Sequence, residues 1–200
     1  GNMNLIIATN NKNKVQEIRM ILGGYFPVAK TIDEAGIALE VVEDGMSFCE
    51  NAIKKAEETL AAAEDFEAAL ADDSGLAVDA LGGAPGIYSA RYANSGHDDS
   101  ANNEKLLREM AGVSNRACRF VCAVALARRG KPTLCVEGAC EGELLAEPAG
   151  EGGFGYDPLF YYKPAKCSFA QMTKEQKNKI SHRRAALELL KVRLALEEQE

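Results

Sequence analysis

Residues 5–24, LIIATNNKNKVQEIRMILGG, contain the stretch that decides the fold. Residues 5–8 are apolar and short enough for a buried strand. A polar stretch over residues 9–14 follows, after which apolar side chains recur at helical spacing as far as Leu22. The pair Gly23-Gly24 then predicts the end of that helix. The segment is therefore predicted to be a strand, a polar turn and a helix.

The rest of the chain continues with helices between strands and then with strands in succession. Strands are expected over residues 37–42, 67–72, 76–80, 120–127 and 134–138, with residues 144–146 as an extension of the sheet. Capping boxes at Ser47 and Thr173 predict the starts of two helices, and Ser181 is expected to cap the last one. This order of elements favours an α/β protein with a mixed sheet.

Length and composition describe an ordinary globular chain. The 200 residues (21.5 kDa) are expected to form one domain over residues 3–200, and Gly1-Asn2 is interpreted as a tag remnant. Hydrophobic residues make up 46% and charged residues 26%, which excludes disordered and collagen-like classes. No apolar run reaches about 18 residues, and no signal peptide is evident, so a cytoplasmic protein without membrane association is expected.

Six cysteines occur without a CxxC pair. Cys118 and Cys122 fall on one face of an apolar run, as buried free thiols do. A chain of this length can bury an adequate core without disulfides, so six core thiols are expected. A metal or redox role is the alternative.

Charge is unevenly distributed. Residues 31–99 carry 16 Asp or Glu against three Lys or Arg, whereas residues 163–193 carry nine Lys or Arg against two Glu. The first block can hold a hard cation and the second an anion, although both are also compatible with solvated faces. The net charge of -7 argues against non-specific nucleic-acid binding.

The polar turn over residues 9–14 is the first candidate for chemistry. Unpaired amides at a helix start attract phosphate, and Thr9, Asn11 and Lys14 add a hydroxyl, an amide and a cation. An ordinary Asn-rich turn is the alternative.

A set of carboxylates is the second candidate. Glu43 and the pair Asp72-Asp73 each follow an expected strand, where ligands of open α/β sheets sit. Neighbouring strand residues point to opposite faces, so only one of the two aspartates can share a Mg²⁺ ion with Glu43. The other can satisfy loop amides, and an Asx turn is the alternative for the whole stretch.

The helix that follows Ser47 carries the third candidate. Asn51 and Lys55 lie one turn apart and share a face, so both can reach the same ligand. Lys54 is expected to pair with Glu50 instead, four residues away.

Two further clusters suit a nucleobase. Glycines around Phe154 let a flat ring approach the backbone, and Asp157 can accept hydrogen bonds from a base or ribose. Lys177, His182 and Arg183 supply donors near a helix start. The alternatives are a tight turn with a core Phe and a solvated basic helix start.

Six motifs occur in an order that resembles the inosine triphosphate pyrophosphatase family in its bacterial form. They are Thr9-x-Asn11-x-x-Lys14, SFCENA (47–52), ADDSGL (71–76), GGAPGIYSARY (82–92), GFGYDP (153–158) and SHR (181–183). The resemblance covers residues 3 to about 196.

The resemblance implies an elongated central mixed β-sheet flanked by helices, with two lobes and an active-site cleft between them. It also implies a homodimer that hydrolyses ITP, dITP or XTP to the monophosphate and pyrophosphate with Mg²⁺. A pyrophosphatase for pyrimidine or modified nucleotides and a non-catalytic nucleotide-binding regulator are the alternatives.

The resemblance also assigns roles to residues. Glu43 and Asp73 are the implied metal ligands, and Asp73 is the implied water-activating base. The implied substrate contacts are Thr9, Asn10, Asn11, Lys12, Asn13, Lys14, Lys55, Ser74, Phe154, Gly155, Tyr156, Asp157, Lys177, His182 and Arg183.

Overall fold

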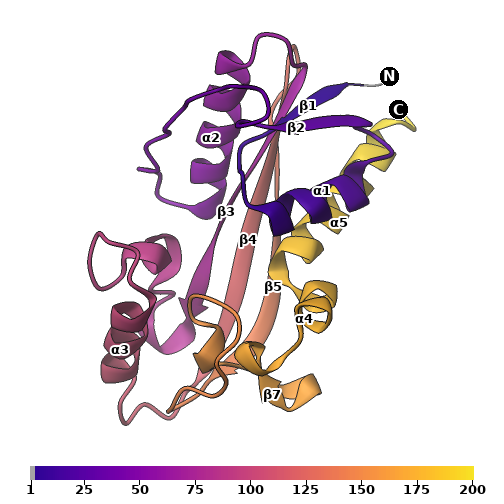
Figure 1. Ribbon diagram of the computed structural model, residues 1–200. Coiled ribbons are helices and arrows are strands. Elements are labelled where there is room, and N and C mark those ends of the chain that lie inside the picture. The colour runs from indigo at the N-terminus through magenta and orange to yellow at the C-terminus, as the bar shows by residue number, and fades with distance from the viewer. Residues whose placement is uncertain (1–2) are drawn as a thin grey trace. The chain divides into compact units, whose positions relative to one another are not determined.

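The computed structural model describes residues 3–200, so Gly1 and Asn2, the expected tag remnant, lie outside the described residues. The α-helices are α1 (Lys12–Leu22), α2 (Phe48–Ala62), α3 (Asp99–Glu109), α4 (Lys174–Ile180) and α5 (His182–Glu197) (Figure 1). The strands are β1 (Asn4–Ile7), β2 (Val28–Thr31), β3 (Ala68–Val78), β4 (Ala117–Arg128), β5 (Leu134–Leu144), β6 (Phe160–Tyr162) and β7 (Cys167–Ser168). No helix among the described residues is long and apolar enough to cross a bilayer.

The strands form a mixed sheet in the order β2-β1-β3-β4-β5-β6-β7. Strand β1 runs parallel to both β2 and β3, and β6 is antiparallel to both β5 and β7. This confirms the predicted α/β class with a mixed sheet. The first helix begins and ends as expected, because Asn11 caps its start and Gly23 follows Leu22.

Several expected strands differ from those observed. The strands expected over residues 67–72 and 76–80 are one continuous strand, β3, so the Asx turn considered for residues 72–75 is wrong. Residues 37–42 form no strand, although their apolar content suggested one. Strand β2 was not predicted, because its four residues acquire strand character through pairing with β1.

The chain folds as two compact units. The first contains the residues up to Asp73 together with residues 122–138 and 183–200, and the second contains residues 74–121 and 139–182. The boundary falls inside β3, β4 and β5. In β3 it lies directly after Asp73, so the two neighbours Asp73 and Ser74 belong to different units.

The sheet of the first unit has two unlike faces, because successive strand residues alternate between them. One face carries large aliphatic side chains and packs against α1 and α5; these strand residues include Leu5, Ile7, Leu70, Val124 and Leu126. The opposite face, which packs against α2, is lined by Ala69, Ala71, Ala123, Ala125 and Ala127. Figure 1 shows α2 on one side of these strands and α1 with α5 on the other. Small side chains on both α2 and the sheet allow their backbones to approach closely.

A cluster of aromatic side chains lies in the core of the second unit. Phe120 of β4 lies with its ring centroid 4.4 Å from that of Phe160 and 5.6 Å from that of Phe169. The ring of His182 stacks on the same Phe120 at 5.0 Å. The cluster therefore joins the start of α5 to the strands of this unit.

The cysteines differ in part from the expectation. Cys49, in the first turn of α2, and Cys135, in β5, form a disulfide, so the prediction of six free thiols is wrong for these two. Cys118, Cys122, Cys140 and Cys167 are free, and the first three are buried. The partners lie 86 residues apart in sequence, and only the packing of α2 on the sheet brings them together.

Reduction of this disulfide should destabilise the protein. A cross-link between residues 86 apart restricts the unfolded chain, which typically contributes about 2–4 kcal/mol to the free energy of unfolding. Urea unfolding of the wild type with and without a thiol reductant measures the effect. The Cys49→Ser/Cys135→Ser variant should unfold near the midpoint of the reduced wild type and should not respond to the reductant. A wild-type midpoint that reductant leaves unchanged would contradict the expectation.

Candidate active site

The turn between β1 and α1 is organised by its own side chains. Asn11 Oδ1 accepts hydrogen bonds from the backbone amides of Asn13 (3.0 Å) and Lys14 (3.2 Å), and Thr9 Oγ1 accepts one from Asn11 (3.2 Å). Asn10 Oδ1 accepts a hydrogen bond from the backbone amide of Asp33. The expectation that this turn presents unpaired amides is therefore wrong for Asn13 and Lys14. Asn11 instead fixes the start of α1 and with it the position of Lys14.

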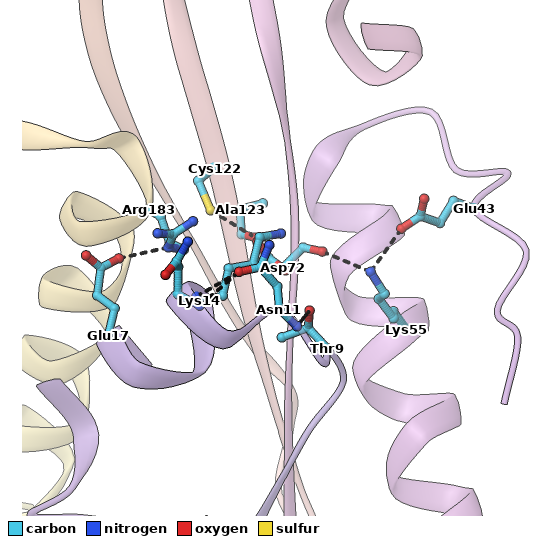
Figure 2. Close-up of polar contacts among 11 residues, drawn as sticks. Thr9, Asn11, Lys14, Glu17, Glu43, Lys55, Asp72, Cys122, Ala123 and Arg183 are labelled. Atoms are coloured by element: carbon cyan, nitrogen blue, oxygen red, sulfur yellow. Dashed lines mark hydrogen bonds and ion pairs between the residues drawn. The ribbon is translucent and has the colours of Figure 1, made fainter. Parts of the chain in front are cut away.

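Asp72 and Asp73 point to opposite faces of β3, as predicted from strand geometry. Asp72 lies on the α1 side, where its Oδ2 is 3.0 Å from Lys14 Nζ (Figure 2). Burial alone would raise the pKa of Asp72, but the charges of Lys14, Lys55 and Arg183 outweigh it and lower that pKa. Attraction to Asp72 in turn raises the pKa of Lys14. Both groups are therefore charged at neutral pH, and Asp72 binds a lysine rather than the loop amides that were expected.

Asp73 lies on the α2 side of the strand. Its Oδ2 accepts a hydrogen bond of 3.1 Å from Asn51 Nδ2. Burial raises the pKa of Asp73 to about 6, and repulsion from Glu43 and Asp72 adds to the shift, whereas Asn51 and Lys55 oppose it. A carboxylate whose pKa lies this close to neutrality is suited to accept a proton.

Lys55 of α2 lies between Glu43 and the backbone of β3 at Asp72. Its Nζ is 3.3 Å from Glu43 Oε1 and 3.4 Å from the backbone carbonyl of Asp72, and Figure 2 shows it reaching from α2 to both. Lys54 does not pair with Glu50 as expected. It bonds the carbonyl of Val42 (2.7 Å) and Asp44 (2.8 Å), and thereby holds the segment that carries Glu43.

Two cavities of the first unit are each lined by predicted site residues. One, of about 250 Å³, is lined by Glu43 and Lys55 together with Ala8 and Thr59. The other, of about 520 Å³, is lined by Asn10 and Lys12. Both Lys55 and Lys12 thus border space that a ligand can enter.

The pair Glu43 and Asp73 suits a hard cation. Glu43 is close enough to raise the pKa of Asp73, so a cation between them would relieve the repulsion. Among residues 3–200 no cluster of three or more His, Cys, Asp or Glu is arranged to hold a metal. Mg²⁺ needs no such cluster, because it commonly binds one or two carboxylates and completes its shell with water and substrate phosphates.

A buried ion pair that the sequence did not suggest orients Arg183. Arg183 Nε donates to Glu17 Oε1 at 2.8 Å, and only 4% of the Glu17 side chain is exposed. Glu17 lies on α1, one turn after Lys14. The alternative of a solvated basic helix start is therefore wrong for Arg183.

The loop over residues 150–158 forms a separate cluster in the second unit. Phe154 is 67% exposed, so the alternative of a core Phe is wrong. Asp157 is almost fully buried, and its Oδ2 accepts the amide of Phe154 (3.1 Å) and contacts Lys177 Nζ. That ammonium also lies 4.1 Å from the centroid of the Phe154 ring. Asp157 thus holds both the backbone of the exposed Phe154 and the largely buried ammonium of Lys177.

Other contacts anchor this loop from its other side. The buried Tyr156 donates its hydroxyl to the carbonyl of Ser89 at 2.6 Å. Gly155 donates its amide to Asp99 (2.9 Å) and accepts from Asn103 (3.0 Å). Gly153 has a φ of +72°, and a Cβ there would lie 2.4 Å from Asp157, so only glycine fits. These anchors were not predicted, because their partners are remote in sequence.

The predicted site residues thus fall into two groups. The first unit contains Thr9, Asn10, Asn11, Lys12, Asn13, Lys14, Glu43, Lys55, Asp73 and Arg183. The second contains Ser74, Phe154, Gly155, Tyr156, Asp157, Lys177 and His182.

The raised pKa of Asp73 makes a prediction about stability. Because the folded state disfavours its charge, Asp73 costs no stability below about pH 4 and lowers stability as the pH rises through 6. In metal-free protein, Asp73→Asn should raise the free energy of unfolding at pH 8 by about 1 kcal/mol, after allowance for solvent screening. Thermal unfolding at pH 8 and pH 4 tests this: the gain should be present at pH 8 and absent at pH 4.

The Glu17–Arg183 pair makes a second prediction. Glu17→Ala should lower the free energy of unfolding by about 3 kcal/mol, because it leaves the Arg183 charge buried without its carboxylate. Glu188→Ala is the matched control, since Glu188 forms an exposed pair with Arg184 at 3.6 Å, worth under about 1 kcal/mol. Equal losses in denaturant unfolding of the two variants would show that burial of the Glu17 pair is immaterial.

Comparison with known proteins places the chain in a family. The sequence model of the Ham1 family matches residues 5–193. A dITP/XTP pyrophosphatase from Desulforamulus reducens is 54% identical over 190 residues, 92% of each chain, and one from Bacillus subtilis is 48% identical over 187 residues, covering 92% of this chain and 93% of the relative. The solved Ham1 protein of Staphylococcus aureus matches with a TM-score of 0.89 at 41% identity, over 97% of this chain and 99% of that one. The resemblance inferred from the six motifs is thereby confirmed, and the chain belongs to the Ham1 family.

Proposed function

We propose that this protein is a pyrophosphatase that hydrolyses deaminated purine nucleoside triphosphates (ITP, dITP and XTP) to the monophosphate and pyrophosphate. The observation that carries the proposal is the arrangement of Glu43, Asp73 and two lysines around β3. The dITP/XTP pyrophosphatases related to the chain support the same activity. This hydrolysis would remove deaminated purine nucleotides from the nucleotide pool.

The triphosphate is bound by the first unit. Lys14 and Lys55 supply positive charge, and the turn over residues 9–13 supplies hydroxyl, amide and lysine side chains. Asp72 keeps Lys14 charged and fixes its ammonium beside the middle of β3. A lysine held in place in this way loses little conformational entropy when it binds a phosphate oxygen.

Glu43 and Asp73 are the residues that would hold Mg²⁺. The ion, when bound, neutralises charge on the phosphate oxygens and on the departing pyrophosphate. Lys55 already contacts Glu43, so this lysine can release the carboxylate and turn to a phosphate oxygen when substrate arrives.

Asp73 positions and deprotonates the attacking water. The water oxygen attacks the α-phosphorus in line, the bond from that phosphorus to the bridging oxygen breaks, and pyrophosphate leaves. The proton of the water passes to Asp73, whose burial favours the protonated form. Positioning of the reactants and stabilisation of charge thus account for most of the rate acceleration, as in phosphoryl transfer generally.

The purine is recognised by aromatic and basic side chains. The exposed ring of Phe154 offers a stacking surface, and Lys177 lies beside it. Lys177, His182 and Arg183 are donors that suit the O6 acceptor of hypoxanthine and xanthine. Adenine carries an amino donor at that position, so it would leave these donors unpaired at a cost of about 1–3 kcal/mol per group.

Two properties follow from the family resemblance and belong to the same proposal. We infer a homodimer, which light scattering of the purified protein would detect. We also infer a cytoplasmic location, because the nucleotide pool on which the proposed reaction acts is found there.

A substrate panel with the products resolved tests the function. ITP, dITP and XTP with Mg²⁺ should yield pyrophosphate and the monophosphate, and ATP should react far more slowly. Asp73→Asn should lower kcat about 10²-fold or more, because it removes the base. Asp79→Asn is the control, since Asp79 binds Arg119 on the surface of the second unit and should leave kcat near the wild-type value.

The outcomes separate the alternatives. Preference for a pyrimidine or modified nucleotide would indicate a related pyrophosphatase with another substrate. Binding of dITP without product would indicate a nucleotide-binding regulator. Near-normal turnover in Asp73→Asn would remove Asp73 from its role as base.

A further inference from the structure

The side-chain amide of Asn51 links Asp73 to the segment that carries Glu43. Asn51 lies in the first turn of α2 and is only 2% exposed. Its Oδ1 accepts the backbone amide of Gly45 at 2.7 Å, and its Nδ2 donates to Asp73 Oδ2 at 3.1 Å. One side chain therefore contacts Asp73 and also the segment that carries Glu43, two residues before Gly45.

The chemistry of the partners fixes how this amide is turned. A backbone N–H can only donate, so the Asn51 oxygen must face Gly45. An ionised carboxylate can only accept, so the Asn51 nitrogen must face Asp73. Asparagine is the side chain of this size with an acceptor and a donor on one carbon, and neither Asp nor Leu can satisfy both partners.

The segment that carries Glu43 depends on α2 for its position. Residues 38–45 form no helix or strand, so the backbone of this segment has no hydrogen-bond ladder to hold it. Its contacts with α2 come from Lys54, through Val42 and Asp44, from Lys55, through the Glu43 carboxylate, and from Asn51, through Gly45. The Asn51 bond is partly buried, as is the Lys55 ion pair, whereas the Lys54 bonds are exposed.

The approach of the segment to Asn51 is unusually close. A Cβ at Gly45 would lie 2.7 Å from Asn51 Oδ1 and 2.9 Å from Glu50 Cβ. Any other residue at position 45 would therefore push the segment away from α2. The missing side chain of Gly45 allows the segment to approach α2 closely, and the hydrogen bond to Asn51 holds it there.

We propose that Asn51 is a positioning residue, which sets Glu43 and Asp73 at the separation that a divalent cation and the attacking water require. The proposal rests on the pyrophosphatase function proposed above. Asn51 acts through its bonds to Gly45 and Asp73, so its proposed role needs no contact with substrate or metal. Its loss should therefore reduce kcat and metal affinity, while KM for the nucleotide, set by the lysines and the base cluster, changes little.

The main test is Asn51→Leu, which keeps approximately the volume and removes both bonds. We expect Mn²⁺, titrated alone against nucleotide-free protein and followed by its electron paramagnetic resonance signal, to bind about tenfold more weakly. We expect kcat for ITP to fall about 10- to 100-fold, with KM within about threefold of the wild type. Thermal unfolding of the same samples reports how much stability is lost.

Asn102 provides a matched control. It is also a buried asparagine (3% exposed) in the first turns of a helix, α3, and it accepts the amide of Ala93 and donates to the carbonyl of Ala90. Its partners are backbone groups instead of a carboxylate. Asn102→Leu should cost stability and leave Mn²⁺ affinity and kcat within about twofold. If both variants lose kcat and Mn²⁺ affinity alike at equal stability, Asn51 is merely structural and the proposal fails.

A second variant, Asn51→Asp, covers the case in which the leucine variant does not fold. It retains an acceptor for Gly45 and replaces the donor that faces Asp73 by an oxygen. We expect kcat to fall about 10-fold or more while the protein stays folded. Wild-type kcat in Asn51→Asp would overturn the proposal. The Mn²⁺ titration needs no substrate, so a wild type that hydrolyses no ITP would contradict the proposed function and leave the test of Asn51 intact.

Discussion

The alternation of side chains along β3 is the constraint on which the site depends. Asp72 and Asp73 are neighbours in sequence, but the pleat of the strand sends them to opposite faces of the sheet. Asp72 meets α1 and binds Lys14, whereas Asp73 meets α2 and binds Asn51. A single strand thereby separates a carboxylate that fixes a cationic side chain from a carboxylate that is available for a metal and a proton. A turn at this place, with both side chains in solvent, would have offered neither.

The two faces of the same sheet carry side chains of different size. Large aliphatic side chains separate β1, β3 and β4 from α1 and α5, and alanines separate the strands from α2. The short alanine side chains bring the α2 backbone near the strand, so Asn51 and Lys55 can reach groups on β3. Packing of apolar residues therefore sets the distances between polar ones. The disulfide between Cys49 and Cys135 holds the same end of α2.

Buried charge in this protein is balanced pair by pair. Asp72 faces Lys14, Glu17 faces Arg183, and Asp157 faces Lys177, so each of these carboxylates has a cation within contact distance. Asp73 is different, because its neighbour is the neutral amide of Asn51 and its nearest charges include Glu43. Burial and like charge disfavour the ionised form of Asp73, and this is the physical basis on which we propose it as the base. The structure thus gives a physical reason to separate Asp73 from Asp72, which strand geometry alone left open and which the family resemblance implied.

The sequence by itself determined the features that depend on near neighbours. The strand and helix over residues 5–22, the caps at Ser47 and Thr173, and the opposite orientation of Asp72 and Asp73 could all be predicted from short-range geometry and chemistry. Only the tertiary structure decided which groups pair. Lys14 meets Asp72 across 58 residues, and Glu17 meets Arg183 across 166. Residues 37–42 looked like a strand but found no partner strand, whereas residues 28–31 became one because β1 lay beside them. Pairings of this kind carry no local signal, because they arise only when helices and strands that are remote in the chain pack against one another.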